Sequence, residues 1–536
     1  MAAKADCDAV VVGAGFGGLY AVRRLTQAGL KVVAFETADD VGGVWYWNRY
    51  PGARCDCESF YYSYSFSEAL QQSWTWSLRY SEQPEILRYL AHVADRFDLR
   101  RHYRFSTAVT GAAFDAAAGL WRITAADGAT VSARFLVTAM GCLSQVNWPE
   151  IEGVRDFAGR LFHTAQWPHE GVDFTGRRVG IIGTGASAVQ AIPRIAEQAA
   201  RLTVFQRTAN WVLPAWNRAA EPDFDVWVKA NYAEIRARCL ASGGAVPFDP
   251  PTRAAGDVSD LERHAVFEAL WTLGGMRFFT AFTDLFTSTA ANAAAQAFVR
   301  GKILETVRDP ETARKLTPSD HPIGVKRPPL EDDYYATFNR DTVELVDIRS
   351  APIQAVEGQV VRTADAEFEL DDLVVATGFD AITGPLLALD LRGRGGVRLA
   401  DVWREGPQTY LGLAVAGFPN LFTITGPLSP SVLANMPTAV EQHVDWIADC
   451  ILELRRRGVA TIEPTDAAQA AWTAHTADVV EGTLYARSNS WYFGSNVPGK
   501  PRTFGVYLGG FGRYREHCEA VARAGYEGFR LDAAPN

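Results

Sequence analysis

Two glycine-rich segments of the chain have the residue types and the spacing that hold a dinucleotide. The first segment contains Gly13, Gly15 and Gly18, and the second contains Gly183, Gly185 and Ala188. In such a turn the first glycine permits a tight bend, the second lets the backbone approach a pyrophosphate, and the third position lets the helix pack against the strand. The helix that follows points its N-terminus at the phosphates. One chain is therefore predicted to bind two dinucleotides.

The residues at the end of the following strand predict which dinucleotide each segment binds. Glu36 ends the second strand of the first unit, where an acid can accept hydrogen bonds from an unphosphorylated ribose, such as that of FAD. The equivalent strand of the second unit ends in Gln206, Arg207 and Thr208. A cation and a hydroxyl there suit a 2′-phosphate, which favours NADPH over NADH. A surface arginine paired with a neighbouring carboxylate remains the alternative for Arg207.

The elements that must position these turns follow from the spacing of apolar residues. Residues 8–35 and 178–205 each predict a strand, a turn, a helix and a second strand. Residues 222–309 are rich in Ala, Leu, Phe and Arg at helical spacing, which predicts a helical insertion. Residues 135–141 and 372–380 resemble buried strands that end in a glycine turn. The predicted fold class is α/β, with two Rossmann-like dinucleotide-binding domains, for FAD and NADP, and a helical insertion.

The predicted domains alternate along the chain. We expect residues 1–142 to form the first part of the FAD-binding domain and residues 143–219 the first part of the NADP-binding domain. The predicted helical insertion is 220–322, the second NADP-binding part is 323–379, and the second FAD-binding part is 380–536.

Composition excludes several classes of function. A chain of 536 residues with 48% hydrophobic and 21% charged residues is typical of a folded protein with more than one core. The net charge of −10 and the lack of a Lys/Arg tract argue against nucleic acid as a partner. A signal peptide is not expected before residue 10, and no apolar run has the roughly 18 to 20 residues that cross a bilayer. We expect a soluble, cytoplasmic protein, and a monomer, that does not bind membranes.

Seven irregularly spaced cysteines do not predict a disulfide framework. Cys55 and Cys57 form a C-x-C pair, but no cluster of Cys or His with zinc spacing lies near it in the sequence, so no metal is expected. A flavin disulfide reductase would also pair FAD with NADPH. Its redox pair usually has four intervening residues, and a disulfide across C-x-C would be strained, which disfavours that class.

The segment between the two glycine-rich turns has the pattern Phe-x-Gly-x-x-x-His-x-x-x-Trp-Pro. Its residues are Phe157, Gly159, His163, Trp167 and Pro168. This segment resembles the signature of the type I Baeyer–Villiger monooxygenases, and the likeness is closest to their phenylacetone monooxygenase-like branch. Further motifs that carry the resemblance are Gly42–Trp45, Arg49–Arg54, Ala376–Asp380, Gly426–Pro427, Ser490–Tyr492 and Asn496–Lys500. Cysteine at Cys57 and Cys142 departs from that branch.

The resemblance implies a flavin monooxygenase that uses FAD, NADPH and O2 to convert ketones to esters or lactones, through a flavin peroxide and a tetrahedral (Criegee) intermediate. By motif, Arg327 is the cation that keeps the peroxide anionic and stabilises the developing oxyanion. Asp56 is its carboxylate partner. Without the resemblance, an interdomain salt bridge is the favoured interpretation of Arg327. The alternative function is a flavin-containing monooxygenase that oxygenates nitrogen or sulfur nucleophiles, and a third class is a non-catalytic nucleotide sensor, which needs no Arg327.

The resemblance also assigns the remaining site residues. Cofactor contacts are expected, besides the fingerprint residues, from Gly43, Trp45, Arg54, Asp56, Lys326 and Trp491. His163 and Trp167 are expected to brace or gate the hinge, because the flavin makes the oxygen nucleophile and no protein base is needed. A solvated Lys326, a core Trp491 and a packed His163 are the alternatives. The expected substrate pocket comprises Val44, Cys57, Cys142, Leu143, Ser431, Val432, Leu433, Met436 and Tyr492. These mainly apolar residues predict a ketone with a substantial hydrocarbon body and do not name it.

Overall fold

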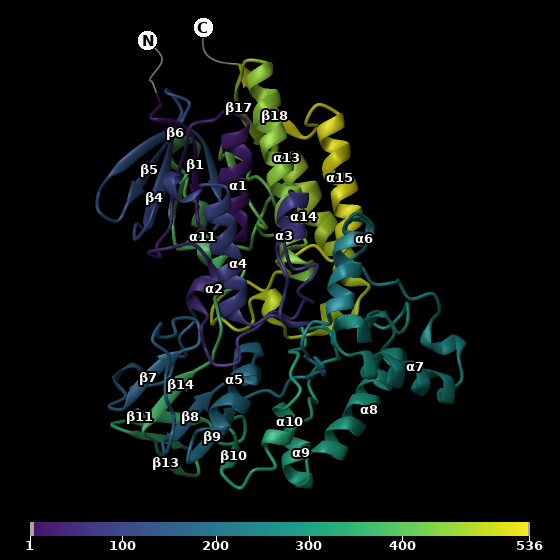
Figure 1. Ribbon diagram of the computed structural model, residues 1–536. Coiled ribbons are helices and arrows are strands. Elements are labelled where there is room, and N and C mark those ends of the chain that lie inside the picture. The colour runs from purple at the N-terminus through teal and green to yellow at the C-terminus, as the bar shows by residue number, and fades with distance from the viewer. Residues whose placement is uncertain (1–4, 534–536) are drawn as a thin grey trace.

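The computed structural model describes residues 5–533 and has two lobes, each built on a mainly parallel sheet (Figure 1). The first lobe contains both ends of the described chain, and the second lies between β6 and β15 in the sequence. This arrangement confirms the predicted α/β class with two Rossmann-like units. Both predicted strand–turn–helix–strand units are present, as β1-α1-β2 and β8-α5-β9.

The first lobe has an eight-stranded sheet in the order β15-β4-β5-β6-β1-β2-β3, with β16 also paired to β6. Its strands are β1 (Cys7–Val12), β2 (Val32–Phe35), β3 (Tyr103–Arg104), β4 (Val109–Asp115), β5 (Leu120–Ala125), β6 (Thr130–Thr138), β15 (Asp390–Arg392) and β16 (Leu421–Thr423). The central strand β1 is apolar and is buried at Val10 and Val11, as expected for a parallel strand that is covered on both faces.

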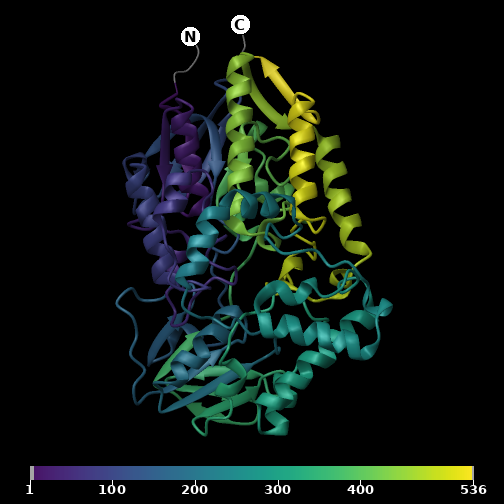
Figure 2. The same ribbon diagram turned by 45° about the vertical axis from the view of Figure 1, so that its right-hand side comes forward.

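Helices from both ends of the chain cover this sheet. The first-lobe helices are α1 (Phe16–Gln27), α2 (Val44–Trp47), α3 (Glu68–Ser73), α4 (Gln83–Arg96), α11 (Gly384–Leu387), α12 (Leu399–Val402), α13 (Met436–Arg456), α14 (Asp466–Glu481) and α15 (Phe511–Arg523). The apolar face of α13 packs against α1 and α15, and Figure 2 shows α13 in green beside the yellow C-terminal helix. A two-stranded ribbon of β17 (Val459–Pro464) and β18 (Phe529–Ala533) completes this layer.

The second lobe has a five-stranded parallel sheet in the order β10-β9-β8-β14-β7. Its strands are β7 (Arg160–His163), β8 (Arg178–Ile182), β9 (Arg201–Gln206), β10 (Val343–Asp347) and β14 (Asp372–Val375). The helices α5 (Ala186–Ala196) and α10 (Tyr334–Thr337) accompany it, and β11 (Ile353–Glu357), β12 (Val360–Thr363) and β13 (Glu367–Glu369) form a small antiparallel sheet. The signature segment thus contributes its own strand, β7, to the edge of this sheet.

The predicted insertion is helical, with α6 (Pro222–Ala241), α7 (Asp260–Leu273), α8 (Thr289–Thr306) and α9 (Pro310–Leu316). Helix α6 packs into the core of the first lobe, whereas Phe267, Phe278 and Phe298 join α7 and α8 to the core of the second lobe. The helices of this region therefore serve two cores. The predicted domain boundaries stay a prediction.

Short 3-10 turns connect the elements. They are η1 (Arg100–His102), η2 (Val154–Asp156), η3 (Ala255–Asp257), η4 (Gly275–Thr280), η5 (Arg394–Gly396), η6 (Ser431–Leu433), η7 (Leu484–Arg487) and η8 (Trp491–Phe493). None of the helices in residues 5–533 combines the length with the apolar character that a membrane span requires.

Two of the segments that pass between the lobes are hydrogen-bonded to each other. Asn147 N donates to Gly378 O at 3.1 Å, and Asp380 N donates to Gln145 O at 2.9 Å. Val146 and Phe379 form an isolated antiparallel bridge between these bonds. The lobes are thus joined by a short two-stranded ribbon.

Gly18 is the position in the first glycine-rich turn that leaves the least room for a side chain. A Cβ atom there would lie 1.7 Å from the carbonyl oxygen of Gly13, which belongs to the strand-to-helix turn. Gly18→Ala must therefore separate α1 from β1, and we expect a loss of about 4 kcal/mol or more in the free energy of unfolding. Thermal and urea denaturation measure it. Gly256→Ala is the control, because no atom lies within 4 Å of its Cβ position; equal stability of the two variants would contradict this packing argument.

Candidate functional site

A cavity of about 1590 Å³ is lined by residues of both lobes and by both glycine-rich turns. Its wall includes the predicted cofactor residues Gly13, Gly15, Glu36, Gly43, Trp45, Arg54, Asp56, Gly183, Gly185, Arg207, Thr208, Lys326 and Trp491, together with Arg327. The structure therefore brings nearly all of these positions together. Gly18 lies behind the wall, where its role is helix packing rather than contact with a ligand.

The first-lobe half of the cavity is shaped by closely approaching glycines. Gly43 has φ +57°, and a Cβ atom on it would lie 2.7 Å from Gly15 Cα. Glu36 accepts hydrogen bonds from Ala14 N at 2.7 Å and from Ala38 N at 2.9 Å, so its carboxylate also braces the turn. Burial raises the pKa of Glu36, and these backbone donors oppose that shift. A backbone cradle with an acid at its end fits an adenosine dinucleotide.

The second-lobe half has three cations around the predicted 2′-phosphate position. Arg207 and Lys326 line the wall, and Arg349, two residues after β10, donates to Thr208 Oγ1 at 3.3 Å and to Asp320 Oδ2 at 2.7 Å. Burial lowers the pKa of Lys326, against the opposing effect of Asp320. An anion placed among these cations would meet several charged donors.

Sequence reasoning missed Arg349, Asp320 and Gln190, all on the cavity wall. Gln190 on α5 accepts from Tyr50 Oη at 2.9 Å and thereby links the lobes. No sequence motif marks Gln190. The position of Arg349 could have been predicted. Arg349 follows β10, which is parallel to β9, and the carboxyl ends of parallel strands meet at the same edge of a sheet, where Arg207 follows β9.

Arg327 and Asp56 form an ion pair between the lobes on the cavity wall. Arg327 Nε donates to Asp56 Oδ2, and Nη2 donates to Oδ1 at 2.9 Å. Nη1 donates to the carbonyl oxygen of Val432 at 2.9 Å, so a third segment fixes the guanidinium plane. Burial lowers the pKa of Arg327, but Asp56 more than offsets this, and the pKa stays well above its usual value. The site holds a permanent, oriented cation.

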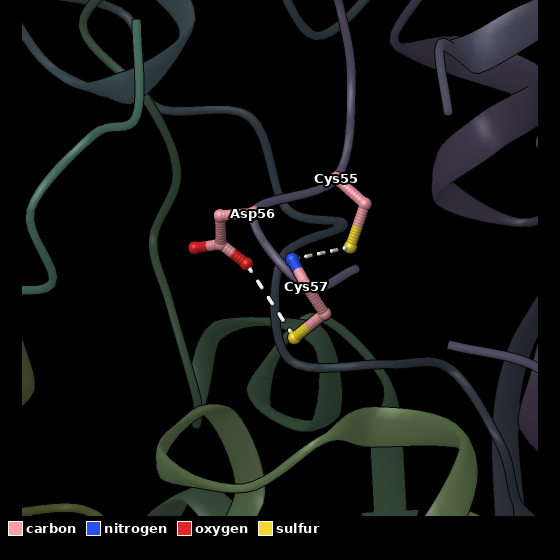
Figure 3. Close-up of side chains that lie close together, drawn as sticks. All are labelled: Cys55, Asp56 and Cys57. Atoms are coloured by element: carbon pink, nitrogen blue, oxygen red, sulfur yellow. Dashed lines mark hydrogen bonds between the residues drawn. The ribbon is translucent and has the colours of Figure 1, made fainter. Parts of the chain in front are cut away.

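Three potential metal ligands lie side by side in this loop: Cys55, Asp56 and Cys57 (Figure 3). Their ligand atoms are within 4.8 Å of one another. Arg327 already binds both oxygens of Asp56 and also reaches Cys57 Sγ at 3.6 Å, which places a positive charge where a metal cation would bind. The expectation that no metal binds here stays a prediction.

The signature residues do not line the cavity, and His163 lies at the ribbon between the lobes. His163, at the end of β7, accepts from Ala165 N at 3.1 Å through Nδ1, and its Nε2 is 3.4 Å from Asn147 O. The same carbonyl accepts from Thr377 Oγ1 at 2.6 Å. His163 thus contacts one crossing segment directly and shares an acceptor with the other, a position that suits bracing of the hinge.

The other signature residues have packing roles in the second lobe. Trp167 is buried against Phe162 and Phe174, Phe157 is buried in the core beside β7, and Pro168 continues from Trp167. Gly159 has no room for a side chain, because a Cβ atom would lie 2.4 Å from Asp371 O.

Six of the nine predicted substrate-pocket residues line the cavity: Val44, Cys57, Cys142, Leu143, Val432 and Met436. Ser431, Leu433 and Tyr492 do not appear on its wall. Ser431 and Tyr492 are buried, and Tyr492 packs behind Trp491 with 4.3 Å between ring centroids. Their side chains therefore support the lining residues in this structure, and direct substrate contact by these three stays a prediction.

Comparison with known proteins supplies the family. Residues 7–243 match the model of the flavin-binding monooxygenase-like family. A Baeyer–Villiger monooxygenase from Pseudooceanicola batsensis is 46% identical over 97% of this chain and 96% of its own length. The chain belongs to the Baeyer–Villiger monooxygenase family. The resemblance inferred from the motifs is thereby confirmed at the level of the family, and the branch stays a prediction.

Other relatives of this Baeyer–Villiger family differ in the reaction named. Cyclohexanone 1,2-monooxygenase from Acinetobacter sp. is 43% identical over 99% of this chain and 98% of its own. Phenazine N-monooxygenase from Lysobacter antibioticus is 42% identical over 99% of this chain and 98% of its own.

Solved structures of the family superpose closely. An oxidized steroid monooxygenase bound to NADP is 53% identical, with a TM-score of 0.94 over 98% of this chain and 100% of that chain. The complex of OTEMO with FAD and NADP is 43% identical, with a TM-score of 0.96 over 99% of this chain and 100% of that chain. Both are ligand-bound forms of the two-lobed fold described above.

The buried His163 of the signature segment should make the free energy of unfolding depend on pH. Burial lowers the pKa of His163 to about 4, below the value of 6.5 expected in the unfolded chain. Between these values the unfolded state binds more protons, so stability falls as the pH drops from 6.5 to 4, by about 3 kcal/mol for this group. His163→Gln should lose correspondingly less stability over that range in chemical denaturation. The exposed His475→Gln should retain the full pH dependence; an unaltered dependence in His163→Gln would contradict the assignment.

Proposed function

We propose that this chain is an FAD-containing Baeyer–Villiger monooxygenase that uses NADPH and O2 to convert ketones to esters or lactones. The observation that carries the proposal is the Arg327–Asp56 pair on the wall of a cavity that both glycine-rich turns share. A positively charged group beside bound flavin and substrate is what the oxygenation of a ketone requires.

The residues fit both cofactors. The Gly15–Gly43 approach and Glu36 would hold FAD, and Arg207, Thr208 and Lys326 would hold the 2′-phosphate of NADPH. When bound, FAD supplies hydride acceptance from NADPH and the activation of dioxygen. Arg349 extends the proposed phosphate site, because its guanidinium is already hydrogen-bonded to Thr208.

Arg327 would act on the substrate as a fixed hydrogen-bond donor and charge. The orientation of its guanidinium is set before substrate arrives. Each of the three guanidinium nitrogens already donates a hydrogen bond, two of them to Asp56 and one to the Val432 carbonyl. Such preorganised donors stabilise negative charge that develops on an oxygen in the transition state. Asp56 would keep the guanidinium charged and aligned, and Trp491 would cover the nicotinamide and the substrate.

The substrate class is a ketone with an apolar body. Val44, Leu143, Val432 and Met436 on the cavity wall favour hydrocarbon surface. The relatives named for cyclohexanone support a carbonyl substrate. Because one methylene in an apolar pocket changes transition-state binding by only about 1 to 3 kcal/mol, a ketone series of graded size is needed to find the preferred member.

Oxygenation of a nitrogen nucleophile is the second candidate function, and the phenazine N-monooxygenase relative favours it. Purified protein incubated with NADPH and a cyclic or aryl ketone should form one ester or lactone per NADPH consumed. Formation of an N-oxide from a heteroaromatic amine, without ester from any ketone, would instead support the second candidate. NADPH oxidation that yields hydrogen peroxide alone would contradict both.

We also infer that the enzyme works as a monomer in the cytoplasm. All seven cysteines are buried free thiols, as a reducing compartment favours. Sedimentation of the purified protein tests the oligomeric state.

Replacement of Arg327 by Ala separates oxygenation from cofactor binding. We expect ester formation to fall by about 100-fold or more, because a preorganised charged donor is lost, whereas bound FAD remains. Product analysis and the flavin absorbance spectrum measure the two effects. Arg122→Ala, on the exposed face of β5, is the matched control and should keep full activity. Full ester formation by Arg327→Ala would refute the assigned role.

Replacement of Arg207 by Ala tests the coenzyme assignment. Loss of one guanidinium from the proposed phosphate site should raise the KM for NADPH far more than the KM for NADH, because only NADPH carries the 2′-phosphate. Steady-state kinetics with both coenzymes measure the ratio. An unchanged preference for NADPH would overturn the phosphate-binding role of Arg207.

A further inference from the structure

The thiol of Cys57 lies between an acceptor and a donor on the wall of the cavity. Its Sγ atom donates to Asp56 Oδ1 at 3.8 Å and accepts from Arg327 Nη2 at 3.6 Å. Figure 3 shows Sγ of Cys57 directed toward the Asp56 carboxylate, with Cys55 Sγ on the other side of the Cys57 backbone nitrogen. Cys57 is buried from bulk solvent, yet it lines the cavity.

These neighbours fix the thiol on the wall of the cavity. The Asp56 carboxylate accepts the S–H group and the Arg327 guanidinium donates to the sulfur, which holds the sulfur at the space that a small oxidant would enter. The other thiols have poorer surroundings for this chemistry. Cys142 also lines the cavity, but burial raises its pKa and no cation is hydrogen-bonded to its sulfur among the described residues. Cys239 is fully buried in α6, and burial raises its pKa to about 12.

We propose that Cys57 is a modification site, at which hydrogen peroxide formed in the cavity during NADPH oxidation without substrate converts the thiol to a sulfenic acid and thereby switches oxygenation off. The source of the peroxide rests on the proposed function. The sulfur lone pair attacks one peroxide oxygen, the O–O bond breaks, and the departing hydroxide takes the thiol proton to leave as water. Sulfur is oxidised and peroxide is reduced, so the step needs no further reactant.

The consequence follows from the position of the new oxygen. It is added at the sulfur that Arg327 Nη2 contacts, within the group of atoms that orients the guanidinium. The thiol is only a weak donor and acceptor toward Asp56 and Arg327, whereas the hydroxyl of a sulfenic acid is stronger in both roles, so the modified side chain competes with the interlobe ion pair for both partners. The modified enzyme would hold its cofactors but misplace the charge that oxygenation requires. A thiol reductant reverses a sulfenic acid, so the effect is a reversible stop rather than damage.

The Cys55–Asp56–Cys57 loop disfavours the further reaction of the sulfenic acid to a disulfide. A disulfide between Cys55 and Cys57 would close across a single intervening residue, which strains its geometry. Burial also raises the pKa of Cys55 well above its usual value, which disfavours its attack on a neighbouring sulfur.

The first experiment adds hydrogen peroxide to the purified holoenzyme without NADPH and traps sulfenic acid with dimedone. Peptide mass mapping should find Cys57 labelled several times faster than Cys142, and Cys239 unlabelled. Equal labelling of Cys57 and Cys142, or an unlabelled Cys57, would overturn the proposal. This arm does not depend on the enzyme's activity, so its failure is distinct from failure of the proposed function.

The second experiment supplies peroxide from turnover. Incubation with NADPH and oxygen in the absence of ketone should label Cys57 and slow subsequent ester formation, and dithiothreitol should restore the rate. A saturating ketone should suppress the labelling. Peroxide release without labelling of Cys57 would overturn the proposed source, whereas absence of both peroxide and ester would contradict the proposed function instead.

Variants at single cysteines then show which thiol causes the loss of activity in peroxide. Each variant's activity is expressed relative to its own value before peroxide is added, because Cys57 contacts the proposed catalytic arginine. Cys57→Ser and Cys57→Val should lose activity several times more slowly than the wild type, and Cys142→Ser and Cys239→Ser should match the wild type. Inactivation of both Cys57 variants at the wild-type rate would overturn the proposal. Should the variants fail to fold, the labelling of the wild-type protein still decides it.

Discussion

The contact between Arg327 and Asp56 is the interaction on which the proposed active site depends. It joins a loop of the second lobe to a loop of the first, and Val432 adds a segment from the C-terminal part of the chain. A half-buried ion pair of this kind contributes little net stability, because desolvation of both charges opposes their attraction. Its value to the protein is orientation: the guanidinium is correctly placed only when the two lobes are together.

Sequence reasoning reached the fold because local patterns determine most of it. The Gly13–Gly18 turn, the apolar run of β1 and the spacing of apolar residues in α1 are all short-range features, and each formed as expected. The division of the helical region between two cores could not be foreseen. The sequence of α6 shows where a helix forms but not which lobe buries it, since that depends on contacts with residues far away in the chain, such as those of α15.

The candidate site, unlike the fold, is formed by residues that lie far apart in the sequence. Nothing in the spacing of Asp56 and Arg327, 271 positions apart, indicates that they meet; only the family resemblance placed them together. Gln190 and Asp320 escaped notice for the same reason, as polar residues without a local pattern. Of the residues predicted for the substrate pocket, Val44 and Met436 line the cavity whereas Ser431 and Tyr492 do not, because a motif identifies the loop but not the direction in which each side chain points.

The nesting of one lobe inside the other sets an order for assembly during synthesis. The sheet of the second lobe is complete once β14 has emerged at residue 375, whereas the first sheet still lacks β15, β16 at residues 421–423, and the α13 layer over α1. Until then residues 136–138 of β6 lack their β16 partners and the face of α1 that packs against α13 is uncovered, although both elements were made first. The nascent chain must therefore keep its oldest segment unfinished while the lobe made later closes, a long-range dependence that slows folding and exposes strand edges to aggregation.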